Sequence, residues 1–252
     1  MTSLSVNKAF EIIEFLSDYH DNVGLRDLAR ELDMAPSTAH RFLSSLRDLG
    51  YVKQDPKTSK YRLSLKFAWL GARVLGCVQV SEIAKIHMEE LTANTNETTH
   101  LAVLENLELV YVAKTDGNQA INMSSRVGHR APLYSTAIGK VLLAYMAEEA
   151  QIKIIQELDL HPKTRNTITS GDRLKNQLND VRKNGYAIDD EENEIGIRCI
   201  GAPIFDHRGE LIAALSLSGW KITMTNERMA ILPKTLMATT DKISEELGYA
   251  GD

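Results

Sequence analysis

The sequence predicts an α+β protein in two parts, a helical front and a longer rear in which strands and helices alternate. Apolar residues recur at spacings of three and four through the first 50 positions, which indicates helices. From residue 97 onward, strand-like apolar runs are interleaved with helical stretches, an order that favours an antiparallel sheet with helices packed on it. The chain has 252 residues, of which 43% are hydrophobic and 25% charged. These values are typical of a folded globular protein and leave room for two domains.

Three helices are expected in the front part. Ser5 is a candidate N-cap for the first helix, whose apolar face comprises Val6, Ala9, Phe10, Ile12, Ile13 and Leu16. The second helix carries its apolar face on Leu25, Leu28, Ala29 and Leu32. A turn at 33–35 follows, in which Asp33 stands where glycine is usual; Asp tolerates the left-handed conformation better than most residues. The third helix runs from Pro36 to Leu49, with Ala39, Phe42, Leu43, Leu46 and Leu49 facing inward, and ends at Gly50.

A hairpin is expected directly after these helices. Two short strand-like stretches within 51–63 flank a polar turn that contains Asp55-Pro56. Helix, short helix, turn, helix and hairpin is the order of a winged helix-turn-helix, which places its last helix in the major groove of DNA. The candidate DNA contacts are Pro36, Ser37, Thr38, His40 and Arg41 at the start of that helix, and Lys57, Lys60 and Arg62 in the hairpin.

The residue types in this set suit DNA. The hydroxyls and the helix N-terminus can bind phosphate, and Arg41 can pair bidentately with guanine. Residues 1–77 hold eleven Lys/Arg and nine Asp/Glu, whereas the whole chain has a net charge of −5. This charge asymmetry indicates that any nucleic-acid contact lies in the front part of the chain. A three-helix domain whose polar face is merely solvated is the alternative.

The stretch from Leu65 to about Thr92 predicts a linker helix or helix pair, whose apolar stripe could pack against a second copy of the chain. Beyond it, strands are expected at 98–104, 109–114, 120–125, 186–189, 198–205 and 211–218. Helices are expected at 135–146, 150–158, 173–184 and 226–247.

Several segments resemble the IclR-type transcriptional regulators of bacteria. They are Leu28-Ala29 through Ala39-His40-Arg41-Phe42-Leu43 to Leu49-Gly50-Tyr51-Val52; Lys60-Tyr61-Arg62-Leu63 with Leu65; Arg126-Val127-Gly128 with 132–140; and Gly185–Glu192 with Gly196–Ile200. The Tyr-Ser-Thr-Ala-Ile-Gly-Lys segment at 134–140 is most similar to the branch that controls sugar-acid use, such as regulators of ketodeoxygluconate or aldonate catabolism. The resemblance implies a winged helix-turn-helix at 1–64, a linker helix at 65–80, and a GAF-like effector-binding and oligomerisation domain at 81–252. It also implies dimers or dimers of dimers.

An effector site is expected at the helix that starts near Ser135 or Thr136. Either residue can cap the helix, leaving backbone N–H groups and the helix dipole available to a carboxylate, although a self-capped helix is the commoner case. By resemblance, Ala137 and Ile138 bring their N–H groups to the effector, and Ile138 is bulkier than the small residue usual there. The resemblance also places Met123, Asp189 and Cys199 in the pocket wall.

Strand alternation puts Ser216 and Ser218 on one face, where both could supply hydroxyls to the same pocket. A carboxylate at Asp189 repels an anionic ligand unless it meets a hydroxyl or takes up a proton. A polyhydroxy acid satisfies both ends of such a pocket, so a sugar acid or 2-keto acid is the expected effector, for example 2-keto-3-deoxygluconate or an aldonate.

Two other classes of function compete with this interpretation. Cys199 with a histidine could form a nucleophilic pair, but its place in an apolar run favours an inert buried thiol. Gly139-Lys140 lacks the preceding glycine of a phosphate loop. An architectural DNA binder that needs no ligand would leave the rear part without a purpose.

Membrane and cofactor roles are not expected, and a zinc site could form only if the fold brings distant histidines together. His100, His129, His161 and His207 lack metal-ligand spacing, and the two cysteines are too few for a disulfide framework or a four-cysteine zinc site. The sequence contains no long apolar run and no secretion signal at its start, which predicts a cytoplasmic protein without a membrane span. The overall prediction is a non-enzymatic regulator without a cofactor, most often a repressor in this branch, that binds a palindromic operator as a homo-oligomer.

Overall fold

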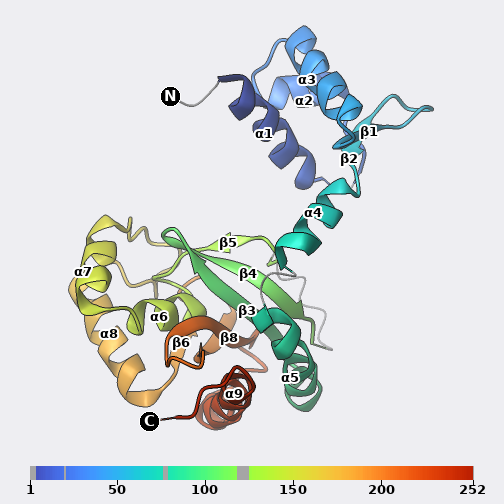
Figure 1. Ribbon diagram of the computed structural model, residues 1–252. Helices are drawn as coiled ribbons and strands as arrows, with labels where there is room; N and C mark the ends of the chain where they lie inside the picture. Colours follow the sequence, from blue (N-terminus) through green and yellow to red (C-terminus); the bar gives the residue numbers. More distant parts are fainter. Residues whose placement is uncertain (1–3, 20, 76–78, 118–124, 252) are drawn as a thin grey trace. The chain divides into compact units, whose positions relative to one another are not determined.

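The computed structural model describes residues 4–19, 21–75, 79–117 and 125–251. The chain divides into two compact units, residues 1–77 and 78–252, which are described separately (Figure 1). Met123, Cys77 and nearly all of the strand expected at 120–125 lie outside the described residues.

The front unit has the expected order of helices followed by a hairpin. Its elements are α1 (Leu4–Ser17), α2 (Leu25–Glu31), α3 (Pro36–Asp48), β1 (Val52–Gln54), β2 (Tyr61–Leu63) and α4 (Lys66–Leu75). Ile12 and Leu16 of α1 pack with Leu28 of α2 and Leu43 of α3 in one apolar core. Asp33 adopts the left-handed conformation predicted for it, with a φ of 47°.

Some details of the front unit differ from the expectation. Helix α1 begins at Leu4, so Ser5 lies inside the helix instead of capping it. Val6 and Phe10 are exposed, because only the stripe through Ile12 and Leu16 faces the other helices. Leu49 is also exposed, since it follows the last turn of α3 as the C-cap.

The wing is tied to the helices by a bridge that the sequence pattern did not predict. Strands β1 and β2 pair antiparallel, with Lys53 opposite Arg62. Val23, just before α2, exchanges two backbone hydrogen bonds of 2.8 Å with Tyr61 of β2. Because Tyr61 is also buried in the core, the wing has a fixed base.

The rear unit consists of one sheet with helices on both faces. Its strands are β3 (Thr98–Glu105), β4 (Glu108–Thr115), β5 (Arg130–Ala131), β6 (Ala187–Asp190), β7 (Ile197–Phe205) and β8 (Leu211–Trp220). Among the described residues, they form a six-stranded antiparallel sheet in the order β5-β4-β3-β8-β7-β6. Its helices are α5 (Gln79–Thr95), α6 (Ala137–Ala144), α7 (Glu148–Glu157), α8 (Gly171–Asn184) and α9 (Asn226–Glu246). The α+β class and antiparallel sheet were predicted, but the short strand β5 was not.

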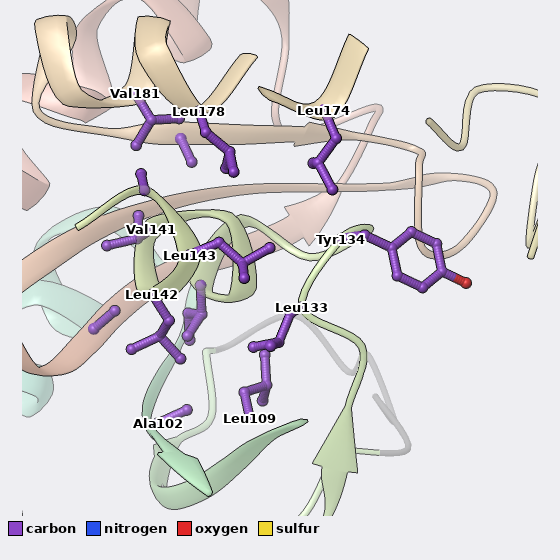
Figure 2. Close-up of a cluster of buried hydrophobic side chains, with 14 of the residues drawn as sticks. Ala102, Leu109, Leu133, Tyr134, Val141, Leu142, Leu143, Leu174, Leu178 and Val181 are labelled. Atoms are coloured by element: carbon purple, nitrogen blue, oxygen red, sulfur yellow. The ribbon is translucent and has the colours of Figure 1, made fainter. Parts of the chain in front are cut away.

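The two faces of the sheet are covered by different helices. Thr99 of β3 meets Thr92 of α5 through a 3.0 Å contact between their hydroxyls, so the odd-numbered residues of β3 face α5. The opposite face packs against α6. Val141, Leu142 and Leu143 of α6 join Leu174 and Leu178 of α8 in a buried cluster (Figure 2). None of the helices in the described residues has the length and hydrophobicity that a membrane span requires.

Candidate DNA-binding surface and effector cavity

The start of α3 is an exposed polar surface. Pro36, Ser37, His40 and Arg41 are exposed, and Thr38 is half-buried. The N-cap residue Ala35 offers no side-chain hydrogen bond to the first turn. The helix start is therefore open to an anion such as a DNA phosphate. The Arg41 guanidinium lies 5.5 Å from the centre of the Phe42 ring.

The wing carries the second set of exposed cations, Lys57, Lys60 and Arg62. Its turn is ordered by the Asp55 carboxylate, which accepts hydrogen bonds from the N–H groups of Lys57 (2.8 Å) and Thr58 (2.9 Å). These bonds lower the pKa of Asp55. The exposed Lys53, opposite Arg62, is a further cation outside the predicted set, and residues paired directly across a hairpin lie on one face.

A cavity of about 260 Å³ opens between the sheet and the start of α6. Of the expected effector residues that the structure describes, all six line it: Ala137, Ile138, Asp189, Cys199, Ser216 and Ser218. The other lining residues were not predicted to contact a ligand; they are His100, Tyr111, Ser125, His129, Arg130, Ala131, Pro132, Thr136, Lys163, Asn193, Glu194 and Ile197.

Strand register brings the polar wall of the cavity together. Asp189 of β6 is opposite Cys199 of β7, which is opposite Ser218 of β8. The next row places Ser216 opposite His100 of β3. The Ser216 and Ser218 hydroxyls are 3.5 Å apart, as expected for alternate residues on one face.

The start of α6 forms the opposite wall. The Thr136 hydroxyl caps the helix by accepting a 3.1 Å hydrogen bond from the Gly139 N–H. The N–H groups of Ala137 and Ile138 precede this bond, and a helix leaves such first-turn donors without intrahelical partners. A Cβ at Gly201 would lie 2.9 Å from the Ala137 carbonyl carbon, so a glycine there lets the helix start approach β7 closely. The Ile138 side chain packs in the apolar core, while its backbone borders the cavity.

Asp189 is a buried carboxylate with an altered titration. Its Oδ1 accepts hydrogen bonds from the N–H groups of Glu192 (2.7 Å) and Asn193 (3.3 Å). Burial nevertheless raises its pKa to about 7. The nearby Lys140 ammonium opposes this shift but is itself paired with Glu192 at 2.6 Å and with the Ile188 carbonyl. Asp189 can therefore exchange a proton near neutral pH.

Lys140 was not recognised as a structural residue in the sequence. Its side chain is completely buried, and the Glu192 carboxylate that pairs with it has one oxygen, Oε2, without a hydrogen-bond partner among the described residues. Burial raises the pKa of Glu192, against the influence of Lys140. Neither Lys140 nor Glu192 lines the cavity. Their ion pair, with the bond from Lys140 to the Ile188 carbonyl, holds the 188–192 segment against α6.

The cavity does not have the chemistry of a cysteine nucleophile. Burial, together with the Asp189 carboxylate, raises the pKa of Cys199, so its thiol remains protonated. His100 and His129 both line the cavity despite their separation in sequence. Across the described residues, no three potential metal ligands of the His, Cys, Asp or Glu type gather in one group.

The arrangement as a whole defines a class of protein, a transcriptional regulator with a winged helix-turn-helix and a separate ligand-binding domain. The chain matches the IclR helix-turn-helix domain at residues 5–56 and the C-terminal domain of bacterial IclR transcriptional regulators at residues 72–245. It therefore belongs to the IclR family of ligand-responsive, DNA-binding regulators, which are not enzymes.

Known relatives and solved structures are similar to this protein over most of its length. The HTH-type transcriptional regulator KdgR of Escherichia coli is 41% identical over 245 residues, covering 97% of this chain and 93% of that protein. The regulator XynR of the same organism is 34% identical, with 97% of each chain covered. The crystal structure of a Thermotoga maritima IclR protein superposes with a TM-score of 0.84 at 38% identity, covering 97% of this chain and 99% of that one.

Proposed function

We propose that this protein is a repressor that binds a palindromic operator and responds to a hydroxylated carboxylate. The observation that carries this proposal is a single cavity with unused helix N–H groups on one wall and the Asp189 carboxyl on the other. The N–H groups suit the carboxylate of the effector, and Asp189 suits a hydroxyl. A sugar acid such as 2-keto-3-deoxygluconate or an aldonate has both groups, and the resemblance of residues 134–140 to the branch that controls sugar-acid use supports the same class.

In this proposal the domains act in sequence along the chain. Residues 1–64 bind DNA, and residues 81–252 bind the effector and a second copy of the chain. Residues 65–80 form the helix that connects these two domains. A dimer or dimer of dimers sets two α3 helices about one DNA turn apart on a palindrome. The effector shifts the population between oligomer geometries and so changes operator affinity. The protein acts in the cytoplasm, where bacterial DNA lies.

The DNA interface is tested with Arg41→Ala. An operator duplex is first selected from a random pool by the wild-type protein, and affinity is then measured by fluorescence anisotropy. We expect a loss of about 1–3 kcal/mol together with weaker sequence preference, because a bidentate contact to guanine disappears. Arg173→Ala on α8 of the rear unit removes another exposed cation and serves as control. Unchanged operator binding by Arg41→Ala would remove this residue from the interface.

The effector site is tested by a thermal-shift screen of aldonates, 2-keto-3-deoxygluconate and pyruvate, followed by calorimetry. Asp189→Ala is expected to bind operator normally and to lose its response to the acid. Asp180→Ala, an exposed carboxylate on α8, should behave like wild type. If Asp189→Ala binds the acid as tightly as wild type does, the cavity is not the effector site.

A further inference from the structure

A chain of hydrogen bonds runs along the sheet wall of the cavity, centred on His100. The His100 Nε2 atom lies 2.8 Å from the Ser125 hydroxyl, and its Nδ1 atom lies 3.4 Å from the Ser218 hydroxyl. Ser218 continues the chain to Ser216 at 3.5 Å. All four residues line the cavity, and His100 is 3% exposed.

The histidine at the centre of this chain is neutral. Burial lowers the pKa of His100 to about 3, and the Lys114 ammonium acts in the same direction. A neutral imidazole has one N–H donor and one acceptor nitrogen, so one serine donates to the ring and the other accepts from it. The serine that donates keeps its oxygen lone pairs available as acceptors, and the serine that accepts keeps its proton available as a donor.

These four residues therefore offer both a donor and an acceptor but no charge. Tyr111 adds a further neutral polar group, because its ring centre lies 5.1 Å from that of His100. Burial raises the pKa of the Tyr111 phenol, which therefore stays protonated. A ligand hydroxyl both donates and accepts, so it matches such a wall. A carboxylate only accepts, and a buried charge without a partner is costly.

The basic side chains near the cavity do not alter this conclusion. Arg130 pairs with Glu105 and Glu108. His129 and Lys163 line the cavity but are exposed to solvent. The acidic groups facing the cavity, Asp189 and Glu194, oppose a second anion.

We propose that the Ser125–His100–Ser218–Ser216 chain is a hydroxyl-reading subsite, which selects long polyhydroxy monocarboxylates over short acids and over dicarboxylates of equal length. The proposal deepens the proposed function, because it assumes that the carboxylate binds at the start of α6. His100 acts as a specificity residue that orients both serine hydroxyls.

The test is calorimetry on the full-length protein with three probes: glycerate, gluconate and glucarate. Wild type is expected to bind gluconate at least tenfold more tightly than either other acid. His100→Phe keeps a flat ring against Tyr111 but removes both nitrogen contacts. This substitution is expected to weaken the affinity for gluconate at least tenfold, while the affinity for glycerate changes less than threefold. His207→Phe, in the exposed turn between β7 and β8, is the matched control.

The outcomes separate this inference from the proposed function. Binding of glycerate and gluconate with equal affinity, or tighter binding of glucarate, overturns the subsite and leaves the regulator intact. If His100→Phe loses affinity for all three acids equally, His100 has a general structural role, and the subsite proposal is also overturned. If wild type binds no hydroxylated acid, the proposed effector class itself is wrong. Should His100→Phe fail to fold, Ser125→Ala must show the same selective loss of gluconate.

Discussion

The two functional regions of this molecule are built in opposite ways. The side chains of α3 and the wing that we propose as DNA contacts are exposed on a small core, and each could be identified from its position in a short segment. The proposed effector cavity is lined by polar groups from strands more than a hundred residues apart, such as His100 and Ser218. Substitutions on the DNA surface should therefore change binding alone, whereas those around the cavity should change stability as well.

The largest effect is expected for Lys140→Met. This substitution leaves the Glu192 carboxylate buried without its partner, a situation that costs about 3–5 kcal/mol. The measurement is the free energy of unfolding of the rear unit in denaturant. The double variant Lys140→Met/Glu192→Leu removes both charges and should recover most of the loss. A single variant as stable as wild type would mean that Glu192 is neutral in the folded protein.

The second effect concerns pH and Asp189. Its folded pKa of about 7 exceeds the unfolded value of 3.8, so its stabilising contribution is complete below pH 3.8 and is lost as pH rises towards 7. At roughly 1.36 kcal/mol per pKa unit, the loss is at most about 4 kcal/mol. Asp189→Asn should remove this part of the pH dependence when unfolding is measured between pH 5 and pH 8.

The same group links effector binding to a proton. An anionic ligand in the same cavity as Asp189 favours the protonated form of this residue, so affinity for the acid should fall above about pH 7, by at most roughly tenfold per pH unit. Calorimetry in buffers of different ionisation enthalpy reports proton uptake directly. Equal uptake by wild type and Asp189→Asn would assign the proton to another group.

The contrast between the two regions also explains what the sequence could predict. Helix periodicity and turn residues are local signals, so the winged helix-turn-helix and the positions of Arg41 and Asp33 followed from the order of residues. Ser216 and Ser218 followed from strand alternation. His100 could not be assigned, because its role depends on β3 pairing with β8, 118 residues away from Ser218. Lys140 was missed because burial of a lysine depends on a partner, Glu192, that adjoins it only in the fold.

Gly201→Ala tests how closely α6 must approach the sheet. The added Cβ would lie 2.9 Å from the Ala137 carbonyl carbon and 3.0 Å from the Ile138 nitrogen. Overpacking of this kind costs about 1–3 kcal/mol, and moving the two N–H groups should weaken acid binding as well. Gly71→Ala on α4 is the control, since its Cβ meets nothing within 4 Å and should stabilise the helix by up to about 1 kcal/mol. Wild-type acid affinity in Gly201→Ala would show that the helix start need not be fixed.

The smallest effect is expected in the front unit, at Asp33. Its φ of 47° lies in the left-handed region, where glycine is free of the steric penalty of a Cβ. Asp33→Gly should stabilise the turn between α2 and α3 by a few tenths of a kcal/mol, because relief of strain is partly offset by the greater freedom of glycine in the unfolded chain. Asp33→Ala keeps the Cβ and loses the polar side chain that tolerates this conformation, so it should be less stable than wild type. Hydrogen exchange of the α3 amides in the full-length protein measures both variants. If the α3 amides are protected equally in Asp33→Ala and Asp33→Gly, the left-handed conformation carries no strain. The turn is then held by the packing of α2 against α3 alone.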